Sequence, residues 1–306
     1  MMMNFQLLAT TYPLLNILFD EPLSNYTYTK TGGKGDAVVF PKTQDEVKYV
    51  VDWAREHEVP LTILGNASNL IVRDGGIRGI VMILTDLKQI TVLPGGVIEA
   101  ESGAALIDTS YQASEESLTG LEFACGIPGS IGGAVYMNAG AYGGEVKEVI
   151  TQVQVITRDG EFQTYSNGDC QFSYRHSVFQ SSDAIVLSVR FELKVGAPLE
   201  IKGEMRRLTA LREEKQPLEY PSCGSVFKRP VGYYTGKLIQ DAGLQGYRIG
   251  GAEISRKHAG FIINVGQASA TDYTDMIDFI KRTIWDLNQV ELEAEVRIIG
   301  EEPQLV

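Results

Sequence analysis

Apolar residues change their spacing several times along the chain, which predicts helices and short strands in alternation. A helix is expected to follow Thr43, which forms a capping-box pattern with Glu46. Apolar residues then recur at helical spacing, at Val47, Val50, Val51 and Ala54. Beyond this helix the spacing changes to short apolar runs at residues 61–64, 69–72 and 80–84, separated by glycine-containing turns. The first part of the chain therefore predicts a small α/β unit.

The middle of the chain predicts one helix and then β structure. Helical spacing covers residues 106–116, and the next segment, residues 125–144, contains seven glycines. Strands are expected at residues 153–157 and 161–165, because they flank Asp159-Gly160, a strong hairpin signal. A longer strand is expected at residues 184–193.

The last third of the chain has a different composition. A boundary is expected near residues 196–198, where β-rich sequence gives way to a basic helix over residues 202–215. A short helix near Leu238, a strand at residues 260–265 and a long helix over residues 272–287 should follow. The long helix has a stripe expected to be buried, at Ile277, Ile280, Ile284 and Leu287. The final strand alternates between an apolar face, Leu292, Ala294, Val296 and Ile298, and a polar face, Glu293, Glu295 and Arg297. Together these elements predict an α+β protein.

Composition and charge narrow the possible functions. The 306 residues, 44% hydrophobic and 22% charged, are typical of two or three globular domains. A net charge of −12 argues against nonspecific binding to nucleic acid or to an anionic membrane. Residues 201–260 nevertheless contain 11 Lys or Arg against six Asp or Glu, which suggests a confined site for an anionic small molecule. A solvated helix face carrying Arg206, Arg207, Arg212 and Lys215 is an equally good explanation of that segment.

The sequence gives no sign of a membrane span, a disulfide framework or a metal site. No run of about 18 apolar residues occurs, and the start lacks a signal-peptide pattern, so we expect a cytoplasmic protein. Cysteine and histidine are few and scattered, at Cys125, Cys170, Cys223, His57, His176 and His258. A histidine metal site or a Ser-His-Asp triad would therefore need long-range contacts, and we expect no metal.

Two glycine-rich segments have the composition of phosphate-binding loops. They are residues 65–69, between two expected strands, and residues 126–133, which precede a third glycine-containing run at residues 138–143. Backbone N–H groups can approach a diphosphate closely only where side chains are small. Neither segment is a G-x-G-x-x-G or G-x-x-x-x-G-K-[ST] motif, which disfavours the two familiar nucleotide folds. Tight turns and close packing remain a structural alternative for each loop taken alone.

These loops carry a family resemblance. Residues 64–72, LGNASNLIV, and residues 126–134, GIPGSIGGA, resemble the FAD-binding loops of vanillyl-alcohol-oxidase-type flavoproteins. Residues 173–177 (SYRHS), 223–228 (CGSVFK) and 292–300 (LEAEVRIIG) resemble three signatures of the UDP-N-acetylenolpyruvoylglucosamine reductases. The five motifs occur in family order between about Asn25 and Glu302, nearly the whole chain. The continuous run from residue 236 to residue 261 is similar to the shorter second type of the family, which lacks an inserted loop over the substrate.

The resemblance implies the fold and the cofactor contacts. It implies a vanillyl-alcohol-oxidase-type FAD-binding domain of two α/β subdomains, residues 1–84 and 85–198, and a C-terminal α+β substrate-binding domain, residues 199–306. Bound FAD is expected at Gly65, Asn66, Ala67, Ser68, Asn69, Gly126, Ile127, Pro128, Gly129, Ser130, Gly132, Gly133, Asn138 and Ala141. Ala67 departs from the family, which often has glycine there, and we expect its small methyl group to fit.

The resemblance also implies the reaction. NADPH would reduce FAD, and the enzyme would then reduce UDP-N-acetylglucosamine enolpyruvate to UDP-N-acetylmuramate for peptidoglycan synthesis. By resemblance, Ser225 donates the proton while Arg175 and Glu295 stabilise the enolate. The residue types suit these roles, because arginine offers a planar fork to a carboxylate and a protonated carboxyl can donate a hydrogen bond. Ser225 is a weak acid and needs nearby cations or a proton relay to assist it.

Substrate contacts are expected in the basic segment. Arg212, Lys215, Lys228 and Lys237 are the candidates for binding the UDP diphosphate, with Arg229 and Arg248 as further candidates, and Tyr174 is expected to position the substrate. Each of the three catalytic candidates also has a structural alternative. Ser225 could be a turn residue, Arg175 a surface ion-pair partner and Glu295 part of a solvated strand face.

Two other functions remain open at this point. The chain could be another FAD-dependent oxidase or dehydrogenase on the same scaffold, or a noncatalytic protein that binds a flavin or a nucleotide sugar. We expect the flavin to be bound noncovalently, because neither glycine loop contains a histidine that could attach it. We also expect the protein to be a monomer.

Overall fold

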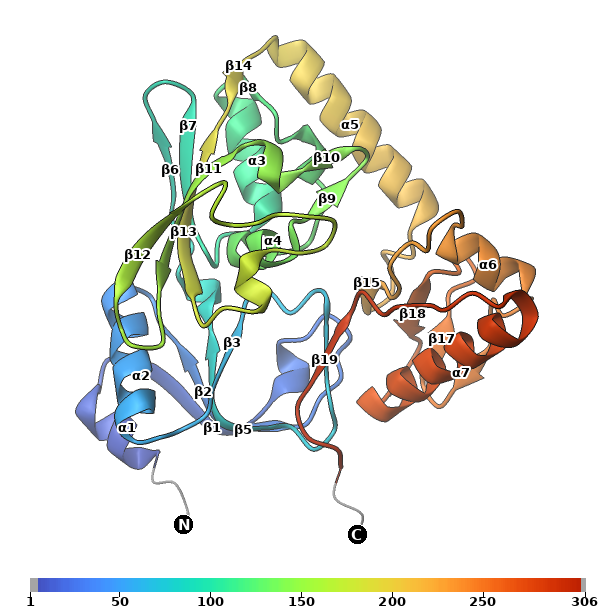
Figure 1. Cartoon of the computed structure of the whole chain (residues 1–306), viewed down its shortest axis with the longest axis horizontal. Helices are drawn as coiled ribbons and strands as arrows, with labels where there is room; N and C mark the ends of the chain where they lie inside the picture. The colour runs from blue at the N-terminus through green and yellow to red at the C-terminus, as the bar shows by residue number, and fades with distance from the viewer. Residues whose placement is uncertain (1–4, 304–306) are drawn as a thin grey trace. The chain divides into compact units, whose positions relative to one another are not determined.

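The computed structural model describes residues 5–303, and their contacts form two compact units (Figure 1). Unit one contains the residues up to Phe19 together with Ala37–Asn66 and Gly79–Arg212. Unit two contains Asp20–Asp36, Ala67–Arg78 and the chain from Glu213 onward. Both units are therefore assembled from segments that are separate in the sequence, and the expected division into three consecutive domains stays a prediction.

Unit one begins with a four-stranded sheet in the order β1-β2-β5-β3. Its elements are α1 (Gln6–Thr11), β1 (Asn16–Pro22), β2 (Lys34–Phe40), α2 (Gln44–Glu56), β3 (Leu61–Leu64) and β5 (Ile77–Ile83). The expected helix cap is confirmed, because Thr43 Oγ1 accepts the N–H of Glu46 at 3.1 Å. The Glu46 carboxylate accepts the N–H of Lys42 at 2.6 Å, one residue before the position that a capping box predicts. The apolar stripe of α2, including Val47, is buried in a core shared with β2, β3 and β5.

A five-stranded antiparallel sheet, in the order β12-β11-β13-β7-β6, forms the rest of unit one. Its strands are β6 (Ile90–Leu93), β7 (Val97–Glu101), β11 (Ile150–Ile156), β12 (Phe162–Ser166) and β13 (Ile185–Glu192). Two helices, α3 (Leu106–Glu115) and α4 (Ile131–Met137), pack against β7, and α4 also packs against β13 (Figure 1). The predicted hairpin is confirmed: β11 and β12 pair antiparallel, and Gly160 takes a φ of +84° in the turn.

Short elements complete unit one. They are the strand pairs β8 (Leu118–Thr119) with β14 (Lys194–Val195) and β9 (Gly140–Ala141) with β10 (Gly144–Glu145). Short 3-10 helices occur in the chain at Leu23–Asn25, Leu84–Asp86, Glu122–Ala124, Val146–Glu148 and Val178–Gln180.

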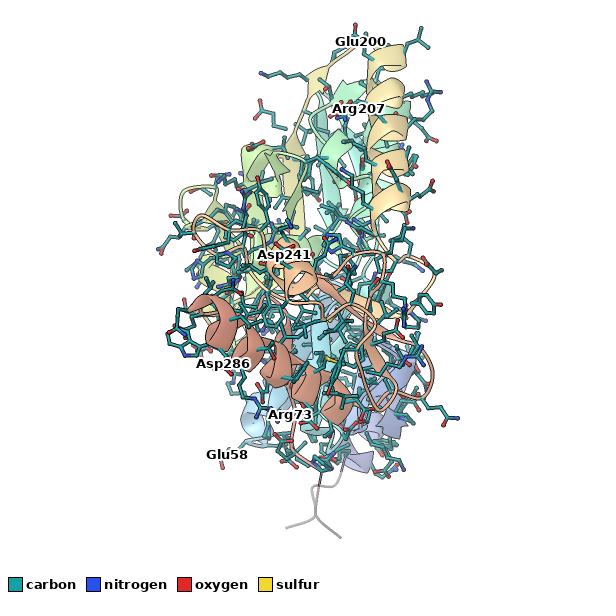
Figure 2. The ribbon with its side chains drawn as sticks, turned by 90° about the vertical axis from the view of Figure 1, so that its right-hand side faces the viewer. Glu58, Arg73, Glu200, Arg207, Asp241 and Asp286 are labelled. Atoms are coloured by element: carbon teal, nitrogen blue, oxygen red, sulfur yellow. The ribbon has the colours of Figure 1, made fainter. Side chains whose placement is uncertain are left out.

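The basic helix α5 (Pro198–Lys215) begins four residues earlier than predicted. Proline fits the first turn of a helix because the N–H it lacks would have no partner there. Glu200 and Arg207 lie on this helix in Figure 2, and Arg207 pairs with Glu204 at 2.6 Å where both are exposed. For this part of α5, a solvated helix face is the better explanation of the positive charge.

Unit two is built on an antiparallel sheet in the order β15-β18-β17-β16. Its elements are β4 (Leu70–Val72), β15 (Ser222–Ser225), α6 (Thr235–Asp241), β16 (Arg248–Ile249), β17 (Ala252–Ile254), β18 (Phe261–Asn264), α7 (Ala270–Asn288) and β19 (Arg297–Ile299). Helix α7 packs against β16, β17, β4 and α6, and β4 pairs in parallel with β19. The Asp74 carboxylate accepts the N–H groups of Ala270 and Thr271 at 2.9 and 2.8 Å, which ties the loop after β4 to the start of α7.

Two expectations for the C-terminal region need correction. Leu287 is 62% exposed, whereas Ile277, Ile280 and Ile284 are buried as predicted. Helical spacing fixes the direction of Leu287 but not whether a neighbour extends far enough to cover the last turn. The final strand is also shorter than its pattern, because only residues 297–299 form β19, with an isolated bridge between Ala294 and Phe227.

Within residues 5–303, no helix combines the length and the apolar character needed to cross a membrane. In the same part of the chain, no three His, Cys, Asp or Glu side chains come together as metal ligands. The three cysteines are free and buried.

Candidate active site

The two predicted phosphate loops touch each other in unit one. Asn66 Nδ2 donates a hydrogen bond to the carbonyl oxygen of Pro128 at 3.1 Å. A Cβ atom at Gly65 would collide with Ser130 Oγ. The 65–69 and 126–133 segments therefore form one surface at this point, although 62 residues separate Asn66 from Pro128.

The second loop turns tightly and then starts α4. The N–H of Gly129 donates to the carbonyl oxygen of Ile127 at 2.9 Å, and Ser130 Oγ then accepts the N–H of Gly133 at 3.3 Å as the helix cap. The N–H of Gly132 donates to the carbonyl oxygen of Ser102 at 2.8 Å. The loop is therefore held by hydrogen bonds within unit one.

Most of these glycines have a packing reason. A Cβ at Gly132 would lie 3.0 Å from the Cβ of Ser102, and a Cβ at Gly126 would lie 2.7 Å from Arg212 Cδ. Gly133 differs, because within 4 Å its Cβ would meet only Ser130 Oγ, at 3.4 Å. The structural alternative thus accounts for Gly65, Gly126 and Gly132, while Gly133 has space on its Cβ side although its N–H already donates to Ser130 Oγ.

Ala67, the residue where the family often has glycine, has a φ of +45°. This left-handed conformation costs residues other than glycine about 1–3 kcal/mol. The carbonyl oxygen of Ala67 accepts the N–H of Tyr28 at 3.3 Å, so the loop is held in place despite the strain. The backbone keeps the conformation that glycine would adopt freely, and the fit of the methyl group beside a bound diphosphate stays a prediction.

In unit two, the first loop continues into contact with one catalytic candidate, Glu295. Asn69 Nδ2 donates to the carbonyl oxygen of Glu295 at 3.2 Å, and Asn69 O accepts the N–H of Arg297 at 3.2 Å. The N–H of Glu295 donates to the carbonyl oxygen of Val226 at 2.7 Å. The structure therefore brings together the backbones of a predicted cofactor residue, Glu295 and the residue after Ser225. Glu295 is partly buried, whereas the Glu293 side chain is 71% exposed.

A β-bulge sets the direction of Ser225. In the antiparallel ladder Ser222 lies opposite Ile263 and Ser225 opposite Phe261, so β15 has one extra residue. Gly224 absorbs the irregularity with a φ of +76°. Bulges of this kind redirect side chains and are frequent beside active sites. Ser225 is exposed. Cys223, two residues before it, and Val226, the residue after it, are buried.

Arg175 occupies a tight turn in unit one. Ser173 and His176 exchange backbone hydrogen bonds at 3.1 Å, and Arg175 between them has a φ of +55°. The guanidinium donates to the carbonyl oxygen of Gly140 at 3.1 Å and lies 5.2 Å from the ring centre of the exposed Tyr174. Arg175 is therefore attached to the third glycine run. Because Arg175 belongs to unit one, its place beside Ser225 and Glu295 stays a prediction.

The third glycine run has one buried residue at its centre. Asn138 is completely buried, and its amide donates to Glu145 Oε2 and to the carbonyl oxygen of Ser173 and accepts the N–H of Lys147. Its side chain therefore holds this run to the Arg175 turn, and a contact with FAD is left to the backbone. Ala141 lies in the β9–β10 hairpin, partly exposed.

Two charged groups near this run have shifted pKa values. Burial raises the pKa of Glu145, but hydrogen bonds from Lys147 and Asn138 and the charge of Arg175 outweigh it, so its pKa is lowered overall. Burial lowers the pKa of Arg212, whose guanidinium lies over Gly126. Arginine has so high a pKa that Arg212 remains charged, and a charge out of water favours an anionic partner.

The predicted lysines differ in their surroundings. Lys228 pairs with Glu293 and Lys237 pairs with Asp241, so each would have to exchange a carboxylate for a phosphate. Lys215 is exposed at the end of α5. Arg248 pairs with Glu253, which is 95% buried, and Arg229 lies over the ring of Tyr234 at 3.8 Å. Arg248 is thus committed to a structural ion pair, which weakens its candidacy.

The sequence reading missed Gln180. Its amide nitrogen donates to the carbonyl oxygens of Arg175 and Tyr136, both at 2.9 Å, and so holds the turn that carries Arg175. A single glutamine at the end of a short 3-10 helix gives no signal in the sequence. Contact with Arg175 is visible only in three dimensions.

Comparison with known proteins identifies the domains and the family of the chain. Residues 35–166 match the family model described as FAD binding domain, and residues 216–299 match UDP-N-acetylenolpyruvoylglucosamine reductase, C-terminal domain. The UDP-N-acetylenolpyruvoylglucosamine reductase of Pediococcus pentosaceus is 57% identical over 97% of this chain and 99% of its own. The reductase of Enterococcus faecalis is 57% identical over 98% of this chain and 100% of its own.

A solved structure is similar over nearly the whole chain. The crystal structure of UDP-N-acetylenolpyruvylglucosamine reductase from Thermus caldophilus superposes with a TM-score of 0.79 at 33% identity, covering 93% of this chain and 98% of that chain. The α+β fold predicted from the sequence, with an FAD-binding domain and a C-terminal domain, is confirmed. The FAD-binding domain and the touching glycine loops define a flavoprotein whose cofactor is FAD. The chain belongs to the UDP-N-acetylenolpyruvoylglucosamine reductase family.

Proposed function

We propose that this flavoenzyme reduces UDP-N-acetylenolpyruvoylglucosamine to UDP-N-acetylmuramate with NADPH, using Ser225 as proton donor and Arg175 and Glu295 as stabilisers of the enolate. Family membership carries the overall reaction and its place in peptidoglycan precursor synthesis. One observation supports the residue assignment: Asn69 of the cofactor loop bonds to Glu295, which in turn bonds to the residue after Ser225. These three segments converge although 226 positions separate Asn69 from Glu295.

The chemistry asks three things of the site. Hydride must reach one carbon of the enol ether, a proton must reach its neighbour, and the charge between these events must be stabilised. Bound FAD supplies the hydride. Segments 65–69 and 126–133 would hold the cofactor, with Gly133 leaving space for a close approach and Ser130 fixing the start of α4.

The remaining steps fall to side chains of the protein. Ser225 is exposed on the redirected side of a bulge and can present its hydroxyl proton to a substrate carbon. Glu295, held through its own N–H and carbonyl oxygen, would donate a hydrogen bond to the enolate while it is protonated. Arg175 offers two N–H groups in one plane to the substrate carboxylate. The partly buried guanidinium of Arg212 and the lysines Lys215, Lys228 and Lys237 would bind the diphosphate.

An anaerobic titration tests this function. The purified protein should show the absorption of an oxidised flavin, lose it when NADPH is added, and regain it when UDP-N-acetylenolpyruvoylglucosamine is added. Failure of the substrate to restore the bands would reject the reductase. Rapid recovery in air with peroxide formation would instead indicate an oxidase on this scaffold, and no bleaching would indicate a noncatalytic binder.

Three further properties belong to the proposal. NADPH and the sugar nucleotide should use the same cleft in turn, which gives parallel initial-rate lines; intersecting lines would mean that both are bound together.

We propose a cytoplasmic monomer, because NADPH and UDP-sugars are cytoplasmic and the reaction as described needs one chain. The flavin should be noncovalent, since Cys125 is buried with Sγ 3.6 Å from the carbonyl oxygen of Met205. Flavin that stays with the acid-precipitated polypeptide would contradict this.

A further inference from the structure

His258 packs against Phe261 at the start of β18, the strand that pairs with β15. Its ring contacts the ring of Phe261 edge-on, with centroids 4.9 Å apart and planes at 67°, and Phe261 is the residue opposite Ser225 in the ladder. On its other side, a Cβ added at Gly236 of α6 would lie 3.3 Å from His258 Cε1. The ring is thus confined between α6 and the start of β18.

Three hydrogen bonds connect this ring to both catalytic segments of unit two. His258 Nδ1 accepts the N–H of Gly260 at 3.1 Å. The carbonyl oxygen of Gly260 accepts the N–H of Val226 at 3.0 Å, and the carbonyl oxygen of Val226 accepts the N–H of Glu295 at 2.7 Å. The path therefore runs from the imidazole, through the N–H and carbonyl groups of Gly260 and then of Val226, the residue after Ser225, to the N–H of Glu295.

The geometry also fixes the state of the ring. Because Nδ1 accepts a hydrogen bond, the proton of the neutral imidazole is on Nε2. Ser255 Oγ accepts the N–H groups of Lys257 and His258, both at 3.2 Å, so the turn that carries the ring is fixed as well. Protonation of Nδ1 would remove the acceptor and oppose the N–H of Gly260.

Charged side chains on the surrounding elements are engaged elsewhere. Lys257 donates to the carbonyl oxygen of Glu213 at 2.7 Å, and Arg256 pairs with Glu253 at 3.4 Å. On α6, Lys237 pairs with Asp241. Burial lowers the pKa of His258, in agreement with a neutral ring among these groups.

We propose that His258 is a positioning residue for proton transfer: its Nδ1 acceptor holds the Gly260 peptide, and through it the segments that carry Ser225 and Glu295. This inference rests on the proposed roles of Ser225 and Glu295. Misplacement of a reacting group by about 1 Å can lower a rate by roughly a hundredfold, so loss of this acceptor should be visible in catalysis.

A matched pair of substitutions isolates the acceptor. His258→Asn keeps an oxygen near the position of Nδ1, whereas His258→Leu has the same branched shape and no acceptor. Both holoenzymes would be studied anaerobically by stopped flow, with flavin reduction by NADPH and flavin reoxidation by the sugar nucleotide measured separately. Flavin content and thermal midpoint would identify any variant that fails to fold.

The two half-reactions should respond differently. We expect His258→Leu to slow reoxidation at least about tenfold, with flavin reduction within about twofold of the unsubstituted enzyme, and His258→Asn to restore most of the lost rate. Equal rates for the Leu and Asn variants, or equal slowing of both half-reactions, would overturn the inference.

Two further measurements separate the possible causes of failure. If Ser225→Ala reoxidises normally, the proposed role of Ser225 fails; if Ser225→Ala is slow and His258→Leu is fast, only the role of His258 fails. Nitrogen-15 NMR of the folded protein supplies a readout independent of activity. Nδ1 of His258 should have the chemical shift of an unprotonated ring nitrogen at pH 7.5, and a proton on Nδ1 would contradict the inference.

Discussion

The side-chain amide of Asn69 donates a hydrogen bond to the backbone carbonyl oxygen of Glu295 at 3.2 Å. This contact joins the 65–69 loop, which precedes β4, to the segment that leads into β19, and the parallel pairing of β4 with β19 continues it. Glu295 therefore has its backbone held on both sides, by Asn69 at its oxygen and by Val226 at its nitrogen. These two bonds fix the point on the backbone from which the Glu295 side chain extends.

Gly65 and Ser130 should be coupled in flavin binding. Gly65→Ala places a Cβ against Ser130 Oγ, and we expect FAD affinity to fall at least tenfold, with about 1–3 kcal/mol lost from stability through overpacking. Ser130→Ala alone should cost about 1 kcal/mol through the lost helix cap. The double variant should recover part of the loss, because the colliding oxygen is gone. Fluorescence titration of the apoproteins with FAD gives the binding free energy of each variant in this double-mutant cycle. A double variant whose loss of binding free energy equals the sum of the two single losses would contradict the predicted coupling.

Ala67→Gly should stabilise the protein. The φ of +45° strains alanine, and relief of that strain exceeds the extra flexibility of glycine in the unfolded chain, for a net gain of about 0.5–1 kcal/mol. The control is Ala210→Gly in the exposed part of α5, which should destabilise by about 0.5–1 kcal/mol. Urea unfolding of both variants tests the opposite signs, and a loss of stability in Ala67→Gly would refute the strain argument.

Lys228→Ala should raise the substrate KM by roughly tenfold or more and change kcat much less. A lysine that contacts a phosphate stabilises the ground state and the transition state alike, and a hydrogen bond from a charged group contributes about 1.5–3 kcal/mol. Lys48→Ala is a suitable control, since Lys48 also has a carboxylate partner, Asp52, at 2.8 Å but lies on α2. Steady-state kinetics that show a fall in kcat at unchanged KM would reject a ground-state role.

The stability of the protein should depend on His258 in mildly acidic solution. Its pKa is lowered by burial from an ordinary value of 6.5, so the unfolded chain takes up a proton at a higher pH than the folded chain does. The contribution of His258 is therefore complete above about pH 6.5 and is lost as the pH falls through its folded pKa. Urea unfolding between pH 7.5 and 5 should show a steeper loss for the unsubstituted protein than for His258→Asn. Parallel curves would mean that His258 does not titrate differently in the two states.

Local patterns predicted most of the elements. The cap at Thr43, the Asp159-Gly160 hairpin and the helices at residues 106–116 and 272–287 depend on neighbours in sequence, and all were found within a few residues of their expected ends. Exposure of Leu287 and the short β19 could not be predicted, because each depends on how far a partner element extends.

The sequence predicted which residues belong to the candidate site but not how they are arranged. Family resemblance named Ser225 and Glu295, but the bulge at Gly224 and the Asn69 contact that organise them depend on strand register. Gln180 and His258 form hydrogen bonds with backbone atoms, which leave no pattern of residue types in the sequence. The packing of Gly126 against Arg212 likewise joins two features that the sequence suggested for separate purposes.

The central claim is that Ser225 supplies the proton during reduction of the sugar nucleotide, and reoxidation of the NADPH-reduced Ser225→Ala holoenzyme by UDP-N-acetylenolpyruvoylglucosamine tests it most directly. Anaerobic stopped flow should show reoxidation slowed by about 10²–10⁴-fold, the usual contribution of a positioned acid, while NADPH reduces the flavin at the unsubstituted rate. Reoxidation of the variant at the unsubstituted rate would contradict the account.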